Sequence, residues 1–331
     1  MNQDGVNCMT TTLLADIGGT KTQLALADEN AHISQPFYAL NKEHTQFESL
    51  LTQYLQDKPK PVNAVIAVAG PVDGNIRCQM TNLSWLIDGI RLKQQFGFSK
   101  VVVMNDLQAT SWGLTSTTEQ AALRLLPSGG EPAPQLNFNL PVVVISPGTG
   151  LGQSCIYPHD GDYVIAATEG GHKTIAPFDN LSAQLIANQW RQSSRPVSWE
   201  NWFSGSGIAN LYSAMYPGQT VPDNEEIGRR ANQDPSSDCG KVMDVFAKAV
   251  YAEAGNLVLQ YLGWGGVIVA GGIPAKLQNL FSKPENIQYL SSKNEYLDRL
   301  RSVPVALCLE QNIPIRGAAV YSRRLLKSEP T

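Results

Sequence analysis

Asp16-Ile17-Gly18-Gly19-Thr20 follows a short apolar segment, residues 12–17, and precedes another, residues 23–27. Two apolar segments joined by a glycine-rich bend are typical of a β-hairpin. Glycines allow close approach of the backbone and turn its N–H groups toward one point, and a threonine hydroxyl adds a donor. With the aspartate as a ligand of Mg²⁺, the motif suits ATP phosphates. Taken alone, it also fits a plain hairpin turn with a surface aspartate.

A second turn of this kind, Gly148-Thr149-Gly150-Leu151-Gly152, follows the apolar strand 142–145 and precedes the run 153–157. Two such turns can hold one nucleotide between them, which makes the pair more informative than either alone. Neither contains GxxxxGK[ST], nor GxGxxG with a downstream ribose carboxylate, so a P-loop or Rossmann site is disfavoured. Gly271-Gly272, after the strand 267–269, offers flat backbone for an adenosine face, although a tight strand-to-helix turn explains it equally well.

Between these turns, short apolar strands alternate with stretches of helical periodicity, which indicates an α/β protein with parallel strands. Strands are predicted at 62–69, 101–104 and 303–309. The predicted helices cover residues 47–55, 182–191, 206–215, 224–232, 238–262 and 318–326. The repeated strand–turn–strand device predicts two similar half-molecules.

Two further groups of polar residues are candidates for substrate chemistry. Asn105-Asp106 ends the strand 101–104, where a carboxylate of a parallel sheet meets ligands and can accept a hydroxyl proton. The alternative is an N-cap pair for the next helix. Glu169-Gly170-Gly171-His172 offers an acceptor and a donor to adjacent sugar hydroxyls, or is a solvated turn. Glu200 is a weaker candidate, since a lone glutamate there also fits a helix-start charge.

The bulk composition limits the class of protein. The chain has 331 residues, 43% of them hydrophobic, which is enough for two domains. A net charge of −4 argues against nucleic-acid or anionic-membrane binding, and five scattered cysteines without CxxC argue against a disulfide framework or a zinc site. No signal peptide is evident, so we expect a cytoplasmic protein that starts at Met1 or Met9.

One uncharged stretch, residues 254–275, is long enough to span a membrane. It contains Asn256, Gln260 and six glycines, which do not suit a membrane span. A helix that ends near Gly263, followed by the buried strand 267–270, explains this stretch better.

Taken in order, these motifs resemble the bacterial glucokinase family of ATP-dependent hexose kinases along nearly the whole chain. The matching features are the two Gly/Thr turns, Asn105-Asp106, Glu169–His172 and Gly271-Gly272, together with Ala69-Gly70-Pro71, Thr81-Asn82 with Trp85, Ala176-Pro177, Glu200 with Ser204-Gly205, and the Gly317 region. Each motif is modest, but the ordered set is specific.

The resemblance implies a two-domain actin-like ATPase (ribonuclease H-like) fold with sugar in a central cleft. Residues 1–112, completed by 317–331, would form the small domain and 113–316 the large one. The implied reaction is transfer of the γ-phosphoryl group of ATP to the 6-hydroxyl of glucose by a homodimer. The implied roles are Asp106 as the catalytic base and as a sugar ligand. The other implied sugar ligands are Asn82, Asn105, Glu169, His172 and Glu200. The residues implied around Mg-ATP are Asp16, Gly18, Gly19, Thr20, Gly148 and Thr149, with Asp16 holding Mg²⁺ directly or through water, and Gly271 and Gly272 would lie at the adenosine.

Two departures from the family pattern concern sugar preference and loop position. Lys173-Thr174 follows His172 where a more apolar and acidic pair is typical, and Ser146-Pro147 replaces a pair of small residues. The alternatives that stay open are a kinase of fructose, mannose or an N-acetylhexosamine, and a non-catalytic sugar sensor. A filament-forming or chaperone ATPase on the same fold would not need Glu169–His172. The zinc motif of the related repressor and kinase superfamily is missing, so no structural zinc is expected.

Overall fold

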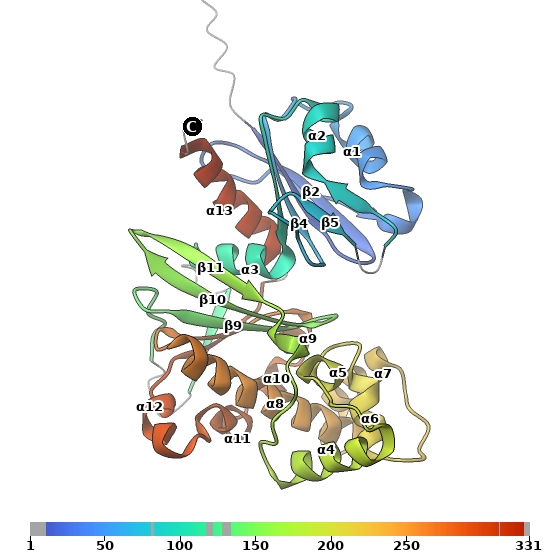
Figure 1. Ribbon diagram of the computed structural model, residues 1–331, viewed down its shortest axis with the longest axis vertical. Coiled ribbons are helices and arrows are strands. Elements are labelled where there is room, and N and C mark those ends of the chain that lie inside the picture. The colour runs from blue at the N-terminus through green and yellow to red at the C-terminus, as the bar shows by residue number, and fades with distance from the viewer. Residues whose placement is uncertain (1–10, 81–82, 117–121, 128–133, 311, 328–331) are drawn as a thin grey trace, which may run out of the picture. The chain divides into compact units, whose positions relative to one another are not determined.

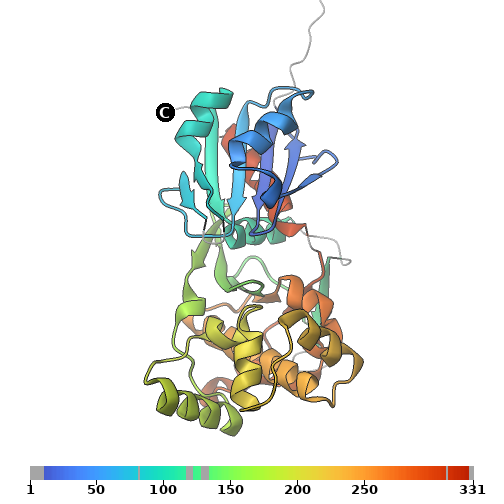
Figure 2. The same ribbon diagram turned by 90° about the vertical axis from the view of Figure 1, so that its right-hand side faces the viewer.

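The computed structural model describes residues 11–80, 83–116, 122–127, 134–310 and 312–327. The chain divides into two compact units, Met1–Thr117 with Asn312–Thr331, and Thr118–Gln311. Each unit is an α/β structure built on one main sheet (Figures 1 and 2). The domain limits predicted at 112/113 and 316/317 stay predictions, five residues away from these bounds in each case.

Unit 1 contains a five-stranded sheet in the order β3-β2-β1-β4-β7. β1 pairs antiparallel with β2, which confirms the first predicted hairpin, and parallel with β4, which in turn pairs parallel with β7. A small second sheet pairs two short strands. The strands are β1 Thr12–Ile17, β2 Lys21–Ala27, β3 Phe37–Leu40, β4 Asn63–Val68, β5 Arg77–Gln79, β6 Leu86–Asp88 and β7 Lys100–Asn105.

Helices cover both faces of the unit 1 sheet. On one face, α1 (Phe47–Leu55) and α2 (Gly89–Phe96) join Leu13, Ala15 and Ile17 of β1 in a buried core. On the other face, α3 (Asp106–Thr115) and α13 (Ile313–Lys327) pack against each other and against β4. Because side chains alternate along a strand, Asp16 lies with Leu14 on the face that carries α3 and α13.

Unit 2 contains a six-stranded sheet in the order β11-β10-β9-β12-β13-β8. β9 and β10 form the second predicted hairpin, and β9, β12 and β13 are parallel neighbours. Both main sheets therefore contain parallel and antiparallel strands, because hairpins add antiparallel strands to a group of parallel central ones. The strands are β8 Leu123–Leu126, β9 Val142–Pro147, β10 Leu151–His159, β11 Asp162–Thr168, β12 Gly266–Val269 and β13 Val305–Cys308.

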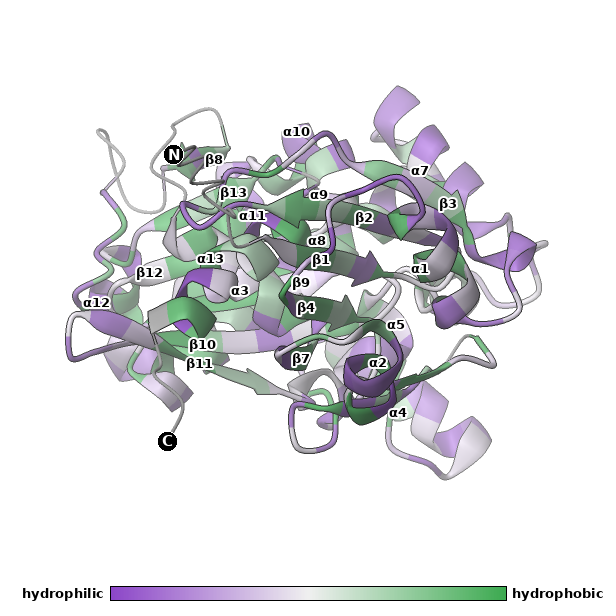
Figure 3. Ribbon diagram, turned by 90° about the horizontal axis from the view of Figure 1, so that it is seen from above, coloured by the Kyte–Doolittle hydropathy of each residue, from purple (hydrophilic) through white to green (hydrophobic). Residues whose placement is uncertain are grey.

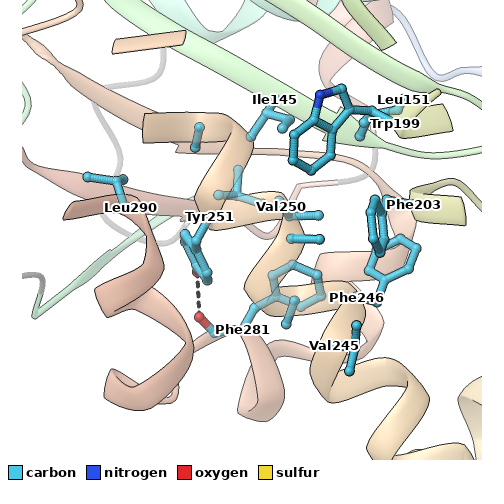
Figure 4. Close-up of a cluster of buried hydrophobic side chains, with 14 of the residues drawn as sticks. Ile145, Leu151, Trp199, Phe203, Val245, Phe246, Val250, Tyr251, Phe281 and Leu290 are labelled. Atoms are coloured by element: carbon cyan, nitrogen blue, oxygen red, sulfur yellow. Dashed lines mark hydrogen bonds between the residues drawn. The ribbon is translucent and has the colours of Figure 1, made fainter. Parts of the chain in front are cut away.

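A long helix, α8 (Asp238–Tyr261), forms the centre of the unit 2 core. Its buried face packs against β9 and β12, and its own Phe246 contacts the rings of Phe203 and Phe281 (Figure 4). The hydroxyl of buried Tyr251 donates to the Phe281 carbonyl. The other helices are α4 Asn180–Ser193, α5 Trp199–Phe203, α6 Ile208–Met215, α7 Asn224–Gln233, α9 Gly272–Lys276, α10 Gln278–Phe281, α11 Pro284–Ile287 and α12 Leu297–Arg301.

The uncharged stretch at residues 254–275 forms the predicted helix end followed by a buried strand. α8 ends at Tyr261, Leu262 adopts a left-handed conformation, and the fully buried strand β12 follows. Figure 3 shows the central strands β1, β4 and β9 as hydrophobic and α7 as mainly hydrophilic. Within the described ranges, no helix combines the length and the apolar character that crossing a membrane requires.

Candidate functional site

The first Gly/Thr turn connects β1 and β2 in unit 1. Ile17 pairs with Thr22, and the Gly18 N–H donates to the Lys21 carbonyl at 3.0 Å. Gly18 therefore uses its N–H inside the turn. Among the described residues, no partner is recorded for the N–H groups of Gly19 and Thr20. These two N–H groups and the exposed Thr20 side chain are the donors that the turn offers to an anion.

A buried asparagine holds this turn from beneath. The Asn41 amide donates to the Gly18 carbonyl at 2.8 Å, and its oxygen accepts from the Thr22 hydroxyl at 2.7 Å. The Asn41 N–H also donates to the Thr20 carbonyl at 2.9 Å. No sequence motif indicates this role, because Asn41 reaches the turn only through the pairing of β3 with β2.

Asp16 and Asp106 form the charged part of unit 1. Asp106 is the first residue of α3, which begins where β7 ends, and both side chains are half-buried. Burial, together with the Asp106 carboxylate, raises the pKa of Asp16 to about 7. Two carboxylates that repel each other in this way suit a divalent hard cation, which prefers oxygen ligands. Asp16 therefore fits the predicted role of a Mg²⁺ ligand.

Asn105 is the N-cap of α3. Its side-chain oxygen accepts from the Leu107 N–H at 2.8 Å, and its amide nitrogen donates to the Gly70 carbonyl at 3.1 Å. The N-cap alternative for Asn105 is thus present in the structure. An Asp106 oxygen accepts from the same Leu107 N–H at 2.8 Å. Asp106 therefore lies at the N-terminus of α3, where backbone N–H groups interact favourably with a negatively charged side chain.

The second Gly/Thr turn connects β9 and β10 in unit 2. Pro147 pairs with Leu151, and the Gly148 N–H donates to the Gly150 carbonyl at 2.9 Å. The loop between α5 and α6 holds this turn: the Gly205 N–H donates to the Gly148 carbonyl at 2.7 Å, and the Ser206 hydroxyl donates to the Thr149 carbonyl at 3.0 Å. Ser206 is a contact that the sequence analysis missed.

The third glycine pair lies beside the second turn. Gly271 has a φ of +95°, and a Cβ there would be 2.7 Å from the Pro147 carbonyl oxygen, so this position requires glycine. Gly272 begins α9, and a Cβ added at Gly272 or at Gly148 would meet no atom within 4 Å among the described residues. The structure thus places Gly271 against Pro147, next to Gly148, and leaves open space at Gly148 and Gly272.

The predicted sugar ligands of unit 2 form one cluster. His172 Nε2 lies 3.9 Å from Glu169 Oε2 and 3.8 Å from Glu200 Oε1. The Glu169 and His172 side chains are 73% and 63% exposed, and that of Glu200 is 29% exposed. Glu200 also accepts from the Leu151 N–H at 2.8 Å. Two carboxylates and an imidazole at this spacing can bind adjacent hydroxyl groups of a polyol.

Unit 1 therefore contains Asp16, Gly18–Thr20, Asn105 and Asp106, and unit 2 contains the other described candidates. Glu200, the weakest candidate in the sequence analysis, joins the sugar cluster to the second turn. Asn82 lies outside the described residues. Within the described part of the chain, no three His, Cys, Asp or Glu side chains form a group that could hold a metal ion.

Comparison with known proteins gives the family. The glucokinase family model matches residues 13–325. The glucokinase of Nitrobacter hamburgensis is 31% identical over 319 residues, which cover 93% of this chain and 95% of that protein. The glucokinase of Yersinia enterocolitica is 31% identical over 320 residues, which cover 95% and 97%.

Solved structures agree with these relatives. A glucokinase from an Antarctic psychrotroph superposes with a TM-score of 0.81 at 29% identity, covering 96% of this chain and 99% of that one. The glucokinase of Balamuthia mandrillaris, 19% identical, has the same fold, with a TM-score of 0.78 and coverage of 96% and 94%. The predicted actin-like ATPase fold is confirmed. From the family match and these relatives we conclude that the chain belongs to the glucokinase family, whose members are ATP-dependent hexose kinases.

Proposed function

We propose that the chain catalyses transfer of the γ-phosphoryl group of ATP to the 6-hydroxyl of glucose, with the residue roles given below. The family match over residues 13–325 supports the reaction. The single observation that supports the roles is the cluster of Glu169, His172 and Glu200, because it joins candidates from two separate segments of the sequence.

The cluster in unit 2 is proposed to bind sugar hydroxyls. Glu169 and Glu200 accept hydrogen bonds, and His172 donates or accepts, so that together they fix the orientation of the ring. Asn105 is proposed to bind a further hydroxyl, although its amide already contacts Gly70 and Leu107. Asn82 completes the proposed set, without structural support.

Asp106 is proposed to act as the general base. Its carboxylate accepts the proton of the 6-hydroxyl as that oxygen forms a bond to the γ-phosphorus, while the bond from phosphorus to the bridging oxygen of ADP breaks. Asp16 would hold Mg²⁺ directly or through water, and the bound ion would offset phosphate charge. Asp106 stands at the start of α3, directly after β7.

The two Gly/Thr turns are proposed to bind the phosphates of ATP. In unit 1 the donors are the N–H groups of Gly19 and Thr20 and the Thr20 hydroxyl, and in unit 2 the Thr149 backbone and hydroxyl. Gly271 and Gly272 are proposed to lie at the adenosine, with the open backbone at Gly272 facing it. The predicted homodimer and cytoplasmic location stay predictions, which size-exclusion chromatography and cell fractionation would test.

The Asp106→Asn variant tests the proposed chemistry. We expect kcat for glucose to fall about 10²–10⁴-fold, since asparagine cannot accept the proton. Glucose binding, measured by calorimetry without ATP, should stay within about threefold, because the sugar cluster of unit 2 is unchanged and the affinity changes by less than 1 kcal/mol. ADP release, measured in a coupled assay over glucose, fructose, mannose and N-acetylhexosamines, should be fastest with glucose.

A matched control is Asp57→Asn, which removes an exposed carboxylate of the same unit. It should leave turnover unchanged. Turnover of Asp106→Asn close to that of the parent protein would remove Asp106 from the role of base. A faster reaction with another hexose would change the assigned substrate.

A further inference from the structure

A buried carboxylate lies beneath the sugar cluster of unit 2. Glu253, on α8, is 1% exposed. Its Oε1 lies 2.7 Å from Lys173 Nζ and accepts from Gln153 Nε2 at 3.0 Å, and its Oε2 accepts from Asn256 Nδ2 at 2.8 Å. Lys173 follows His172 directly in the sequence. The lysine that departs from the family pattern therefore neutralises a charge inside the core.

The backbone of Lys173 connects the two segments that carry the sugar ligands. Its N–H donates to the Gly170 carbonyl at 3.1 Å, which closes the 3-10 turn Gly170–His172. Its carbonyl accepts from the Trp199 N–H at 3.0 Å, at the start of α5. Because Glu200 is the next residue, the position of Lys173 influences both His172 and Glu200.

Gln153 provides a second connection from Glu253 to the same turn. The Gln153 side chain is fully buried, and its amide oxygen contacts Gly170 so closely that no Cβ would fit there. The Gln153 carbonyl accepts from the Thr168 hydroxyl, which in turn accepts from the Gly170 N–H, both at 3.2 Å. Glu253 thus contacts two residues that both fix the backbone of the turn.

Only the Glu253 side of this ion pair is buried, since the Lys173 side chain is 39% exposed. The pair contributes little net stability, because the cost of removing Glu253 from water offsets the attraction. Its directional contacts can instead select one arrangement of the groups that it joins. We infer that Glu253 and Lys173 are positioning residues, which hold Glu169, His172 and Glu200 in the arrangement that binds sugar. This inference rests on the proposed roles of those three residues.

The variants Glu253→Gln, Lys173→Met and the double variant test the inference. Each single variant should raise the glucose KM and the glucose Kd, measured by calorimetry without ATP, by about fivefold or more, because small displacements of binding groups are costly. The KM for ATP should change less than about twofold. The double variant should lose no more glucose affinity than the single variant that binds glucose less tightly, since all three variants break the same connection. Lys173→Arg, which keeps the charge, should recover most of the affinity for glucose.

Lys248→Met is the matched control. Lys248 Nζ, on the same helix as Glu253, pairs with Asp244 at 2.7 Å and lies over the Tyr289 ring. This variant should leave the glucose KM unchanged whatever its effect on Tm. If Glu253→Gln and Lys173→Met lower Tm but leave glucose KM and Kd unchanged, the pair is only structural and the inference is wrong. A parent protein without glucose-dependent turnover would instead remove the proposed function.

Discussion

The two Gly/Thr turns share a topology but differ in length and in the source of their charge. Each connects an antiparallel hairpin whose first strand has a parallel neighbour, β4 in unit 1 and β12 in unit 2. Residues 18–21 separate the paired residues Ile17 and Thr22, whereas residues 148–150 separate Pro147 and Leu151. The residue before the last strand position is Asp16 in unit 1 and the neutral Ser146 in unit 2.

The second turn obtains its carboxylate from a different segment. Glu200 of α5 accepts from the Leu151 N–H, directly after the turn, while its other oxygen lies 3.8 Å from His172. The first turn is instead held by Asn41, and its own aspartate faces Asp106. Under the proposed residue roles, this difference predicts a division in which the first turn contributes catalytic charge and the second turn joins nucleotide and sugar contacts.

The largest effect expected between the two turns comes from removing the charge of Asp16 in the first one. Asp16→Asn should lower kcat about 10²–10³-fold, the size expected for loss of a charged group that acts in the transition state. Glucose binding should be retained, since Asp16 is not a sugar ligand in the proposal. Steady-state kinetics at saturating glucose and ATP, over a Mg²⁺ titration, measure this loss.

Ser146→Ala is the control at the equivalent position of the second turn. Ser146 is partly exposed and neutral, so kcat should change less than about threefold, in line with surface substitutions worth under about 0.5 kcal/mol. Equal losses in the two variants would contradict the division of roles.

A smaller effect is expected at the link between the second turn and the sugar cluster. Glu200→Gln should raise the glucose KM about ten- to a hundredfold, because charge-assisted hydrogen bonds contribute about 1.5–3 kcal/mol. The KM for ATP should also rise, by a smaller factor, since the Leu151 N–H loses an ionised acceptor. Steady-state kinetics with each substrate varied in turn separates the two effects.

Glu225→Gln removes an exposed glutamate of α7 in the same unit and serves as the control. Both KM values should stay unchanged in that variant. An unchanged glucose KM in Glu200→Gln would place Glu200 in a structural role only.

The predicted elements match the structure where the apolar periodicity and the glycine turns of the sequence indicate the same boundaries. The helix at 47–55 and both hairpins are confirmed, because their apolar spacing and glycine bends are local signals. The short strand β8 was missed, since Leu123–Leu126 has no alternating pattern and forms its pairing with β13, far along the chain. The sequence around a short strand does not indicate which distant strand it will pair with.

The residues of the candidate site could be predicted from the sequence where they belong to recognisable motifs. Glu169, His172 and Glu200 were named from the sequence, and the structure brings them together. Asn41 and Glu253 were not, because each reaches the site through tertiary contact: Asn41 through the pairing of β3, Glu253 from the buried face of α8. The alternative that Asn105 caps the following helix stayed open in the sequence, and the structure shows the capping hydrogen bond.

The smallest effects are expected for the residues that hold the two turns in place, Asn41 at the first turn and Ser206 at the second. Asn41 is buried and makes two side-chain hydrogen bonds, so Asn41→Ala should lower the free energy of unfolding by about 1–3 kcal/mol, because the Gly18 carbonyl and the Thr22 hydroxyl lose their partner. Displacement of the turn should raise the KM for ATP several-fold, which corresponds to the free energy of about one neutral hydrogen bond. The glucose KM should stay constant. Chemical denaturation and steady-state kinetics measure the two effects.

Ser206→Ala makes the corresponding change at the second turn. Ser206 is exposed, and water can replace its hydrogen bond to the Thr149 carbonyl, so stability should change by less than about 0.5 kcal/mol and the KM for ATP by less than about threefold. The Gly205 N–H still donates to the Gly148 carbonyl in this variant, which keeps the turn in place. A loss in Ser206→Ala as large as that in Asn41→Ala would mean that the second turn depends on its surface contact as strongly as the first depends on its buried one.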